Sequence, residues 1–234
     1  MRLVLLPGLD GTGALFAPFI AAAPPDVTLT VVPLPERAVE YAATAAILSA
    51  SVALDADTVL LAESFAGPLA LRLAQRDAPA AVVLVNSFIR PPLPAAMCRL
   101  ATPALFRVRL PDVAVRHWLL GADATPALLG AFRDALDRVP ARVIAARVRA
   151  LASVDDAADA AQLACPLLYL RGTSDRLVRD RSVRELQSCA PSTEVVRVPG
   201  PHLLLQAAPR SAWAALEPYL ERWAAVSRNH RDGP

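Results

Sequence analysis

The chain has 234 residues, of which 55% are hydrophobic, and its net charge of +2 comes from 24 arginines against 22 acids, with no lysine. The absence of lysine excludes Schiff-base, pyridoxal and phosphate-loop lysine chemistry, and because the arginines alternate with acids we expect no nucleic-acid partner. The three cysteines lack paired or zinc-site spacing and no apolar stretch reaches the ~18 residues of a membrane span, so we expect a cytoplasmic protein without a metal or other cofactor.

Six apolar runs predict the strands of the fold. Most of them are continuous rather than alternating, which indicates strands buried on both faces, as in a parallel sheet covered by helices. Helical patterns lie between the runs, and this alternation predicts an open α/β sheet with right-handed crossovers. The expected strands are 3–6, 27–34, 58–62, 81–86, 167–171 and 194–198, and the expected helices around them are 38–53, 68–75, 179–188 and 211–226.

A glycine-rich loop, residues 7–13, follows the first predicted strand. Its glycines, Gly8, Gly11 and Gly13, lack the G-x-G-x-x-G spacing of a dinucleotide fingerprint, so the loop does not predict a nucleotide site. Glycines permit an unusual backbone path. We therefore expect this loop to offer a backbone N–H group to a ligand at the carboxyl edge of the sheet.

Ser64 lies at the end of the third predicted strand and directly before a helical pattern. The small residues Ala62, Ala66 and Gly67 leave room for the backbone to fold back sharply, as it does at a nucleophile elbow. The helix begins just behind the serine, so its N–H groups point at whatever binds there. The alternative is an ordinary serine N-cap on a crossover helix.

Residues 88–162 show no strand pattern. Prolines divide this interval into short helices, and its length is too great for a loop. We expect a helical cap over the carboxyl ends of the strands, where ligands bind in open α/β sheets. The expected cap helices are 94–107, 112–120, 125–138 and 140–152, and the expected units are a core of residues 1–87 and 163–228, a cap of residues 88–162 and a tail of residues 229–234, with the polar chain fraying from residue 227.

A serine nucleophile needs a base that removes its proton. Of the three histidines, His230 lies in the expected tail and His117 in the expected cap, whereas His202 follows the last predicted strand. The carboxyl ends of parallel strands meet at one edge of a sheet. His202 is therefore the predicted base for Ser64.

The base needs a carboxylate that orients it, and Asp175 follows the fifth predicted strand. A carboxylate there can accept the imidazole N–H and stabilise the cation formed during proton transfer. Asp180 is a competing acid, but its position is typical of the first turn of a helix. Acyl transfer also needs donors for an oxyanion, which we assign to the N–H groups of Leu9 and Phe65.

Four segments carry a resemblance to a known family: Leu-Pro-Gly-Leu-Asp-Gly-Thr-Gly, Ala-Glu-Ser-Phe-Ala-Gly, Arg-Gly-Thr-Ser-Asp-Arg-Leu-Val and Gly-Pro-His-Leu-Leu-Leu-Gln. Through them the chain resembles the α/β-hydrolase superfamily, and within it the small capped bacterial carboxylesterases. The resemblance covers nearly the whole core and implies an open, mostly parallel sheet of about six strands with a helical cap insertion. It also implies a triad of Ser64, Asp175 and His202. Alanines stand at positions 62 and 66, where the G-x-S-x-G motif has glycines.

The leading functional hypothesis is a serine hydrolase that cleaves a small-molecule carboxylic ester through an acyl-enzyme on Ser64. The apolar composition of the cap suggests an apolar acyl pocket. Apolar residues at helical spacing are, however, more often the core of a cap than a binding surface. The candidate substrate-binding residues are Phe88, Met97, Phe106, Trp118 and Leu203.

Two other functions remain open at this point. A thioesterase or acyltransferase acting on carrier-bound acyl groups would use the same residues, because loop 7–13 is reminiscent of editing thioesterases and the arginines of the cap suit an acidic acyl carrier. The third hypothesis is a non-catalytic binding module on a hydrolase scaffold. A complete set of Ser64, Asp175 and His202 argues against it, since a binding protein has no need of all three.

Overall fold

The computed structural model describes residues 1–231, in which six strands form one sheet with every neighbouring pair parallel. The expected parallel sheet of about six strands is therefore confirmed. The strand order is β2-β1-β3-β4-β5-β6, so the direction of the connections reverses between β1 and β3, which is where ligands bind in open α/β sheets. The strands are β1 (Arg2–Leu6), β2 (Thr28–Val31), β3 (Thr58–Glu63), β4 (Ala81–Val85), β5 (Leu167–Gly172) and β6 (Glu194–Val198).

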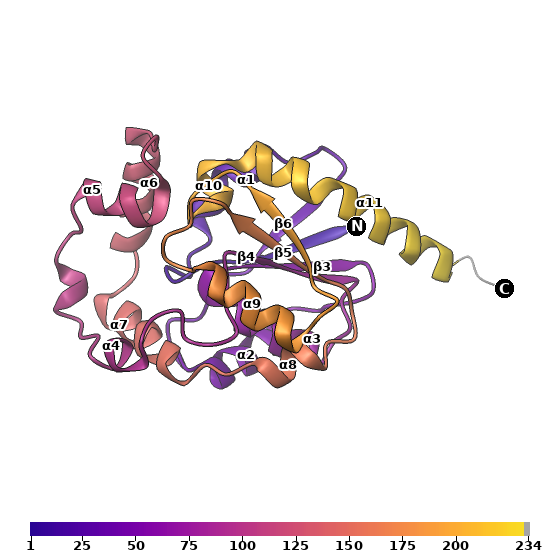
Figure 1. The fold of residues 1–234 in the computed structure, drawn as a ribbon, viewed down its shortest axis with the longest axis horizontal. Coiled ribbons are helices and arrows are strands. Elements are labelled where there is room, and N and C mark those ends of the chain that lie inside the picture. Colours follow the sequence, from indigo (N-terminus) through magenta and orange to yellow (C-terminus); the bar gives the residue numbers. More distant parts are fainter. Residues whose placement is uncertain (232–234) are drawn as a thin grey trace.

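Helices cover both faces of this sheet (Figure 1). The longer core helices stand between or after the strands, as their sequence patterns predict, and the shorter ones at 17–21, 157–161 and 204–207 have no counterpart among the predicted elements. The helices are α1 (Ala17–Ala21), α2 (Tyr41–Ser51), α3 (Gly67–Ala74), α4 (Ala95–Arg99), α5 (Asp112–Val115), α6 (Pro126–Asp137), α7 (Ala141–Ala150), α8 (Ala157–Ala161), α9 (Asp180–Cys189), α10 (Leu204–Ala207) and α11 (Pro209–Arg231).

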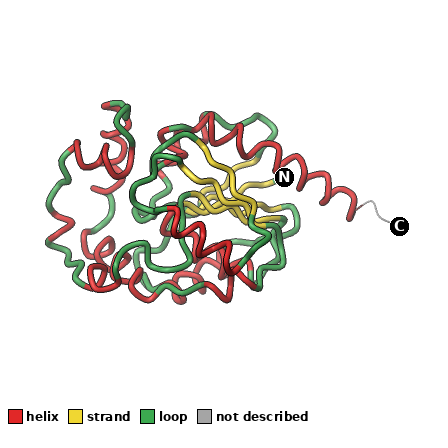
Figure 2. Tube along the Cα trace, in the orientation of Figure 1, coloured by secondary structure: helices red, strands yellow, loops and turns green. Residues whose placement is uncertain are grey.

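Alternate residues of each strand build the two halves of the core. In β1, Leu3 and Leu5 face α1 and α11, where Phe19 stacks on Trp213 with ring centroids 4.3 Å apart. Residues of the same strand with the opposite parity face α2, α3 and α9. Because both faces are buried, the strands are apolar throughout, which explains the continuous runs in the sequence. Figure 2 shows the strands as a central layer between helices.

The insertion between β4 and β5 is helical, and its described residues contain no strand. In Figure 1, α4 to α7 lie together at the end of the molecule opposite the C-terminus. The expected single helix over 94–107 is wrong: α4 is short and a separate 3-10 turn follows at Leu105–Arg107, because Pro103 interrupts the segment. A π-helical turn, Arg116–Leu120, continues α5.

The two ends of the insertion are joined where they meet the core. The backbone N–H of Asp156 donates to the carbonyl of Ile89 at 2.9 Å, and the buried Asp156 carboxylate pairs with Arg72 of α3. The Arg72 guanidinium in turn lies 5.5 Å from the centre of the Tyr41 ring. Residues on either side of the insertion are thus fixed to the helical layer beneath the sheet.

The C-terminal helix is longer than the sequence pattern suggests. The expectation that the chain frays from residue 227 is wrong, since α11 continues to Arg231 and the Ser227 hydroxyl donates to the Ala56 carbonyl at 2.9 Å. Of the predicted tail 229–234, residues 232–234 lie outside the described residues. The predicted strand 27–34 is also shorter, ending before Pro33, which lacks a backbone donor. None of the described helices has both the length and the apolarity that crossing a membrane requires.

Candidate active site

Ser64 lies at the turn between β3 and α3 with a backbone that is unusual for a serine. Its φ is +49°, in the left-handed region that residues with a side chain rarely adopt. Such a conformation persists where neighbouring groups fix it. Here the Ser87 hydroxyl donates to the Ser64 carbonyl at 2.6 Å, and the Tyr41 hydroxyl donates to the Phe65 carbonyl at 3.0 Å. The two peptide groups that follow the Ser64 Cα atom are therefore held in place.

Gly67 completes this turn by leaving space for Ser87. A Cβ atom added to Gly67 would lie 1.8 Å from the Ser87 hydroxyl oxygen, closer than any contact allows. The backbone of Gly67 is ordinary helix, with a φ of −55°. The requirement for glycine is therefore one of space and not of backbone angle, and it arises from a hydroxyl that holds Ser64.

The structure brings Ser64, His202 and Asp175 together. His202 Nε2 lies 2.9 Å from Ser64 Oγ, and His202 Nδ1 lies 3.0 Å from Asp175 Oδ2. All three side chains are buried. An imidazole between a hydroxyl and a carboxylate can take the hydroxyl proton on one nitrogen while the carboxylate accepts a hydrogen bond from the other. The other histidine with a described side chain, His117, instead contacts Arg176.

Asp175 is held in place by its own loop. Its Oδ1 accepts from the N–H groups of Leu177 (2.8 Å) and Val178 (3.0 Å), so that Oδ2 faces His202. Arg171 Nη1 lies 3.6 Å from Asp175 Oδ2. The same guanidinium binds Asp180, because Arg171 Nε donates to Asp180 Oδ1 at 2.9 Å. That hydrogen bond lowers the pKa of Asp180. The competing acid, Asp180, therefore pairs with arginines, and its carboxylate has no contact with the His202 imidazole among the described residues.

Asn86 joins the loops that carry Asp175 and His202. Its Nδ2 donates to the carbonyls of Pro201 (2.9 Å) and His202 (2.7 Å), and its Oδ1 accepts from the N–H of Gly172 at 2.7 Å. Asn86 also has a positive φ of +45°, which asparagine tolerates better than most residues. Asn86 was not among the residues predicted for the site. The available signal was a polar residue that directly follows the apolar run of β4, the strand next to β3.

Loop 7–13 lies beside Ser64. A Cβ atom added to Gly8 would lie 3.8 Å from Ser64 Cβ, which is ordinary van der Waals contact. Among the described residues, no hydrogen bond uses the N–H of Leu9 or of Phe65. Two backbone donors near a nucleophile are the usual means of stabilising an oxyanion.

Glu63, the residue before Ser64, is buried beneath the site. Its Oε2 accepts from Gln206 Nε2 at 2.9 Å, while Glu63 Oε1 and Gln206 Oε1 have no partner among the described residues. Burial raises the pKa of Glu63 to about 8, and the charges of Asp10 and Asp175 act in the same direction, against the hydrogen bond from Gln206. The carboxyl group of Glu63 is therefore mainly protonated at neutral pH.

The predicted substrate-binding residues do not gather in one place. Phe88 and Leu203 are buried in different hydrophobic clusters, and Phe106 packs against a third. Met97 is 60% exposed and Trp118 44% exposed. Their role in binding substrate stays a prediction.

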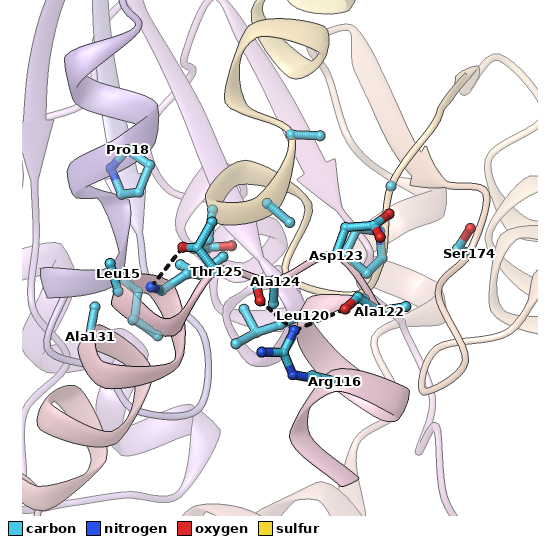
Figure 3. A pocket seen from close by; sticks show the side chains of 18 of the residues that line it. Leu15, Pro18, Arg116, Leu120, Ala122, Asp123, Ala124, Thr125, Ala131 and Ser174 are labelled. Atoms are coloured by element: carbon cyan, nitrogen blue, oxygen red, sulfur yellow. Dashed lines mark hydrogen bonds between the residues drawn. The ribbon is translucent and has the colours of Figure 1, made fainter. Parts of the chain in front are cut away.

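A pocket of about 1200 Å³ lies between the insertion and the core (Figure 3). Leu15 and Pro18 line it from the core, and Arg116, Leu120 and the segment 121–125 are among the residues that line it from the insertion. Ser174 and Pro201, which precede Asp175 and His202, also line it. Ser64 and the five predicted substrate-binding residues are not among its lining residues. The pocket therefore adjoins the loops of the site without containing the serine.

The described residues contain no cluster of three or more histidine, cysteine, aspartate or glutamate side chains placed to hold a metal ion. Cys98, Cys165 and Cys189 are free thiols.

The fold is that of the α/β-hydrolases. No family model matches the sequence, and no curated protein matches it. Solved structures match over nearly the whole chain. They include a bromoperoxidase from Bacillus anthracis (TM-score 0.79, 17% identity, 94% of this chain and 91% of that one) and a thermophilic esterase from Thermogutta terrifontis (0.74, 18%, 95% and 90%). An enol-lactonase from Burkholderia xenovorans is similar too (0.69, 19%, 99% and 90%).

Substituting Gly67 tests the packing behind the serine. Gly67→Ala should lower the free energy of unfolding by ~1–3 kcal/mol, because the new methyl group has no room beside Ser87. Gly130→Ala is the matched control: it lies in the interior of α6 with nothing within 4 Å of an added Cβ. That change should raise the free energy of unfolding by ~0.5–1 kcal/mol. Urea denaturation measures both, and equal effects at the two glycines would contradict the steric account.

Glu63→Gln tests the buried carboxyl group. Because the folded-state pKa of Glu63 is raised to about 8 from an ordinary 4.5, the folded protein keeps a proton that the unfolded chain loses as the pH rises. Glu63 therefore stabilises the fold at low pH, and this contribution is lost as the pH rises from about 4.5 to about 8, with a slope approaching ~1.4 kcal/mol per pH unit.

The Glu63→Gln variant lacks that proton equilibrium. Its free energy of unfolding, measured by urea denaturation, should therefore gain on that of the wild type as the pH is raised across this range. Glu217→Gln, which removes an exposed carboxyl group from α11, is the control for loss of a carboxyl group. Parallel pH profiles for Glu63→Gln and the wild type would show that the carboxyl group is ionised in the folded state.

Proposed function

We propose that this protein is a serine hydrolase that cleaves carboxylic esters through an acyl-enzyme on Ser64. The observation that carries the proposal is the unbroken hydrogen-bonded series from Ser64 Oγ through the His202 imidazole to Asp175 Oδ2, with distances of 2.9 and 3.0 Å. The α/β-hydrolase fold is compatible with many reactions, since a bromoperoxidase, an esterase and an enol-lactonase share it. The proposal therefore rests on the site and not on the fold.

In the first half of the reaction, Ser64 Oγ attacks the acyl carbon of the ester while His202 Nε2 takes the hydroxyl proton. Asp175 Oδ2 accepts a hydrogen bond from Nδ1–H and stabilises the imidazolium. The carbonyl oxygen becomes an oxyanion, which the N–H groups of Leu9 and Phe65 bind. When the tetrahedral intermediate collapses, the imidazolium gives its proton to the departing alkoxide, which leaves as the alcohol.

In the second half, water replaces the alcohol. His202 removes a proton from the water as it attacks the acyl carbon, and the oxyanion forms again at the same donors. Collapse returns the proton from the imidazolium to Ser64 Oγ and releases the carboxylic acid. The enzyme is then restored to its starting protonation state.

We assign residues 88–162 the role of a cap over the site and residues 1–87 and 163–228 that of the catalytic core. The support is the position of the insertion, which extends from the carboxyl edge of the sheet where Ser64 lies. A small-molecule ester is the proposed substrate. A thioester would form the same acyl-enzyme, so oxygen esters are distinguished from thioesters by comparing p-nitrophenyl esters with coenzyme A and carrier-protein thioesters of equal acyl length.

Ser64→Ala should lower ester turnover by more than ~10³-fold, because the variant lacks the oxygen that forms the acyl-enzyme. Hydrolysis of p-nitrophenyl esters measures the loss. A fluorophosphonate should modify the wild type at Ser64, detected as a mass shift of the peptide, and leave the variant unmodified. Ser211→Ala, at the exposed start of α11, should behave as wild type. Failure of the wild-type protein to react with the fluorophosphonate would overturn the proposed function.

A further inference from the structure

Arg147 is a buried cation without an acidic partner. It lies on α7 of the insertion, its exposed fraction is 2%, and it makes no ion pair within the described residues. Burial lowers the pKa of the guanidinium, and the charges of Asp10 and Glu36 oppose that shift. A guanidinium keeps its charge inside proteins, so its burial needs full hydrogen-bond compensation.

Backbone carbonyl groups provide that compensation. Nη1 of Arg147 donates to the carbonyls of Leu9 (2.9 Å) and Asp10 (2.7 Å), and Nη2 donates to those of Leu34 (3.3 Å) and Pro35 (3.1 Å). The first two belong to the loop after β1 and the other two to the loop after β2. A planar guanidinium suits this task because its donors point in fixed, divergent directions. One side chain of the insertion thus joins two loops of the core.

These bonds fix the backbone that carries the Leu9 N–H. The Gly8 carbonyl accepts from the Gly11 N–H at 3.0 Å, and the Gly11 carbonyl accepts from the Leu34 N–H at 2.8 Å. With the carbonyls of Leu9 and Asp10 bound to Arg147, every carbonyl from Gly8 to Gly11 has a partner. The Gly8 carbonyl is engaged inside the turn. Because an N–H points opposite to the carbonyl of its own peptide, the Leu9 N–H is directed out of the turn.

Contact between the guanidinium and the loop is also direct. A Cβ atom added to Gly11 would lie 2.4 Å from Arg147 Nη1, and Gly11 has a φ of +70°. The loop therefore needs glycine here both for its backbone angle and for the approach of the arginine. The neighbouring Asp10 turns its carboxylate away to accept from the N–H and hydroxyl of Thr12, at 3.0 and 2.6 Å.

We propose that Arg147 is the positioning residue of the oxyanion hole, holding the Leu9 N–H beside Ser64 from the cap. This inference rests on the proposed function, and it adds that the hole is complete only when α7 is docked on the core. Arg147 touches neither substrate nor the reacting atoms. It acts through the loop backbone, and its removal should release the loop rather than the nucleophile.

The oxyanion exists only during the reaction and is absent from the bound substrate. A donor that binds charge in the transition state raises kcat and has little effect on KM. Losing one such donor lowers kcat by ~10²–10³-fold, and displacing it by about 1 Å costs ~10²-fold. Arg147→Ala and Arg147→Lys should therefore lower kcat about 10²-fold, the lysine variant because an ammonium group cannot reach four carbonyls at once.

Arg149→Gln is the matched control. Arg149 lies on the same helix and also donates to a backbone carbonyl, that of Ala101 at 2.7 Å, but this carbonyl belongs to the insertion itself. The control variant should keep kcat within about three-fold of wild type. Each variant is first titrated to completion with a fluorophosphonate, so that kcat refers to active sites and a partly unfolded sample does not count as a slow enzyme.

Rescue by a small cation adds a readout that a structural role would not move. Methylguanidinium at tens of millimolar should raise kcat of Arg147→Ala by filling the space left by the side chain, and it should not raise kcat of the wild type or of Arg149→Gln. The proposal is overturned if folded Arg147→Ala and Arg147→Lys keep wild-type kcat, or if their loss lies wholly in KM or in the number of titratable sites. Should the alanine variant fail to fold, Arg147→Lys decides by the same criteria.

The two proposals fail in different ways. If the wild type neither reacts with a fluorophosphonate nor turns over esters, the proposed function is wrong. If the wild type is labelled and active while the Arg147 variants match it per active site, the hydrolase assignment stands and the positioning role of Arg147 is wrong.

Discussion

The left-handed backbone at Ser64 is the constraint on which the rest of the site depends. A serine does not adopt a φ of +49° without compensation, so the surroundings must fix it. They do so through hydroxyl groups from two other elements, Ser87 after β4 and Tyr41 on α2. The strained turn places the Ser64 hydroxyl 2.9 Å from the imidazole of His202, which lies 138 residues further along the chain.

Polar side chains that bind backbone groups hold the remaining loops of this edge. Asn86 fixes the loops after β5 and β6, and Arg147 fixes those after β1 and β2. Apolar packing positions the helices and strands, but its free energy changes little when a loop shifts by a small distance. A buried hydrogen bond that is stretched leaves an unpaired polar group, which costs free energy. Precision at the site therefore comes from polar contacts that are buried and nearly all satisfied.

Much of this arrangement follows from local sequence patterns. The apolar runs predict the strands because both sheet faces are covered, and Ser64, Asp175 and His202 are predicted together because each follows a strand of a parallel sheet. The contacts that adjust their geometry are invisible to such patterns. Arg147 meets Leu9 across 138 positions, and Glu63 meets Gln206 across 143. An arginine in an amphipathic helix normally indicates a solvated face, so only tertiary structure identifies this one as buried.

The errors in secondary structure have related causes. The segment from residue 94 to 107 has apolar residues at helical spacing, but Pro103 prevents one continuous helix. At the C-terminus the polar composition suggested an end to the helix, whereas α11 is anchored by its apolar face and by the contact of Ser227 with the core.

The bond between Asp156 and Ile89 gives the insertion a further property. The insertion leaves the core and returns to it at one place, beside this hydrogen bond. A change in the length of the insertion therefore costs little free energy of folding, because the entropy of closing a loop grows only slowly with its length. The parts of the insertion outside α7 can therefore be lengthened or trimmed over evolutionary time, whereas α7 is tied to the core loops by the hydrogen bonds of Arg147. The walls of the pocket that the insertion lines can thereby change while the strands and loops of the core are kept.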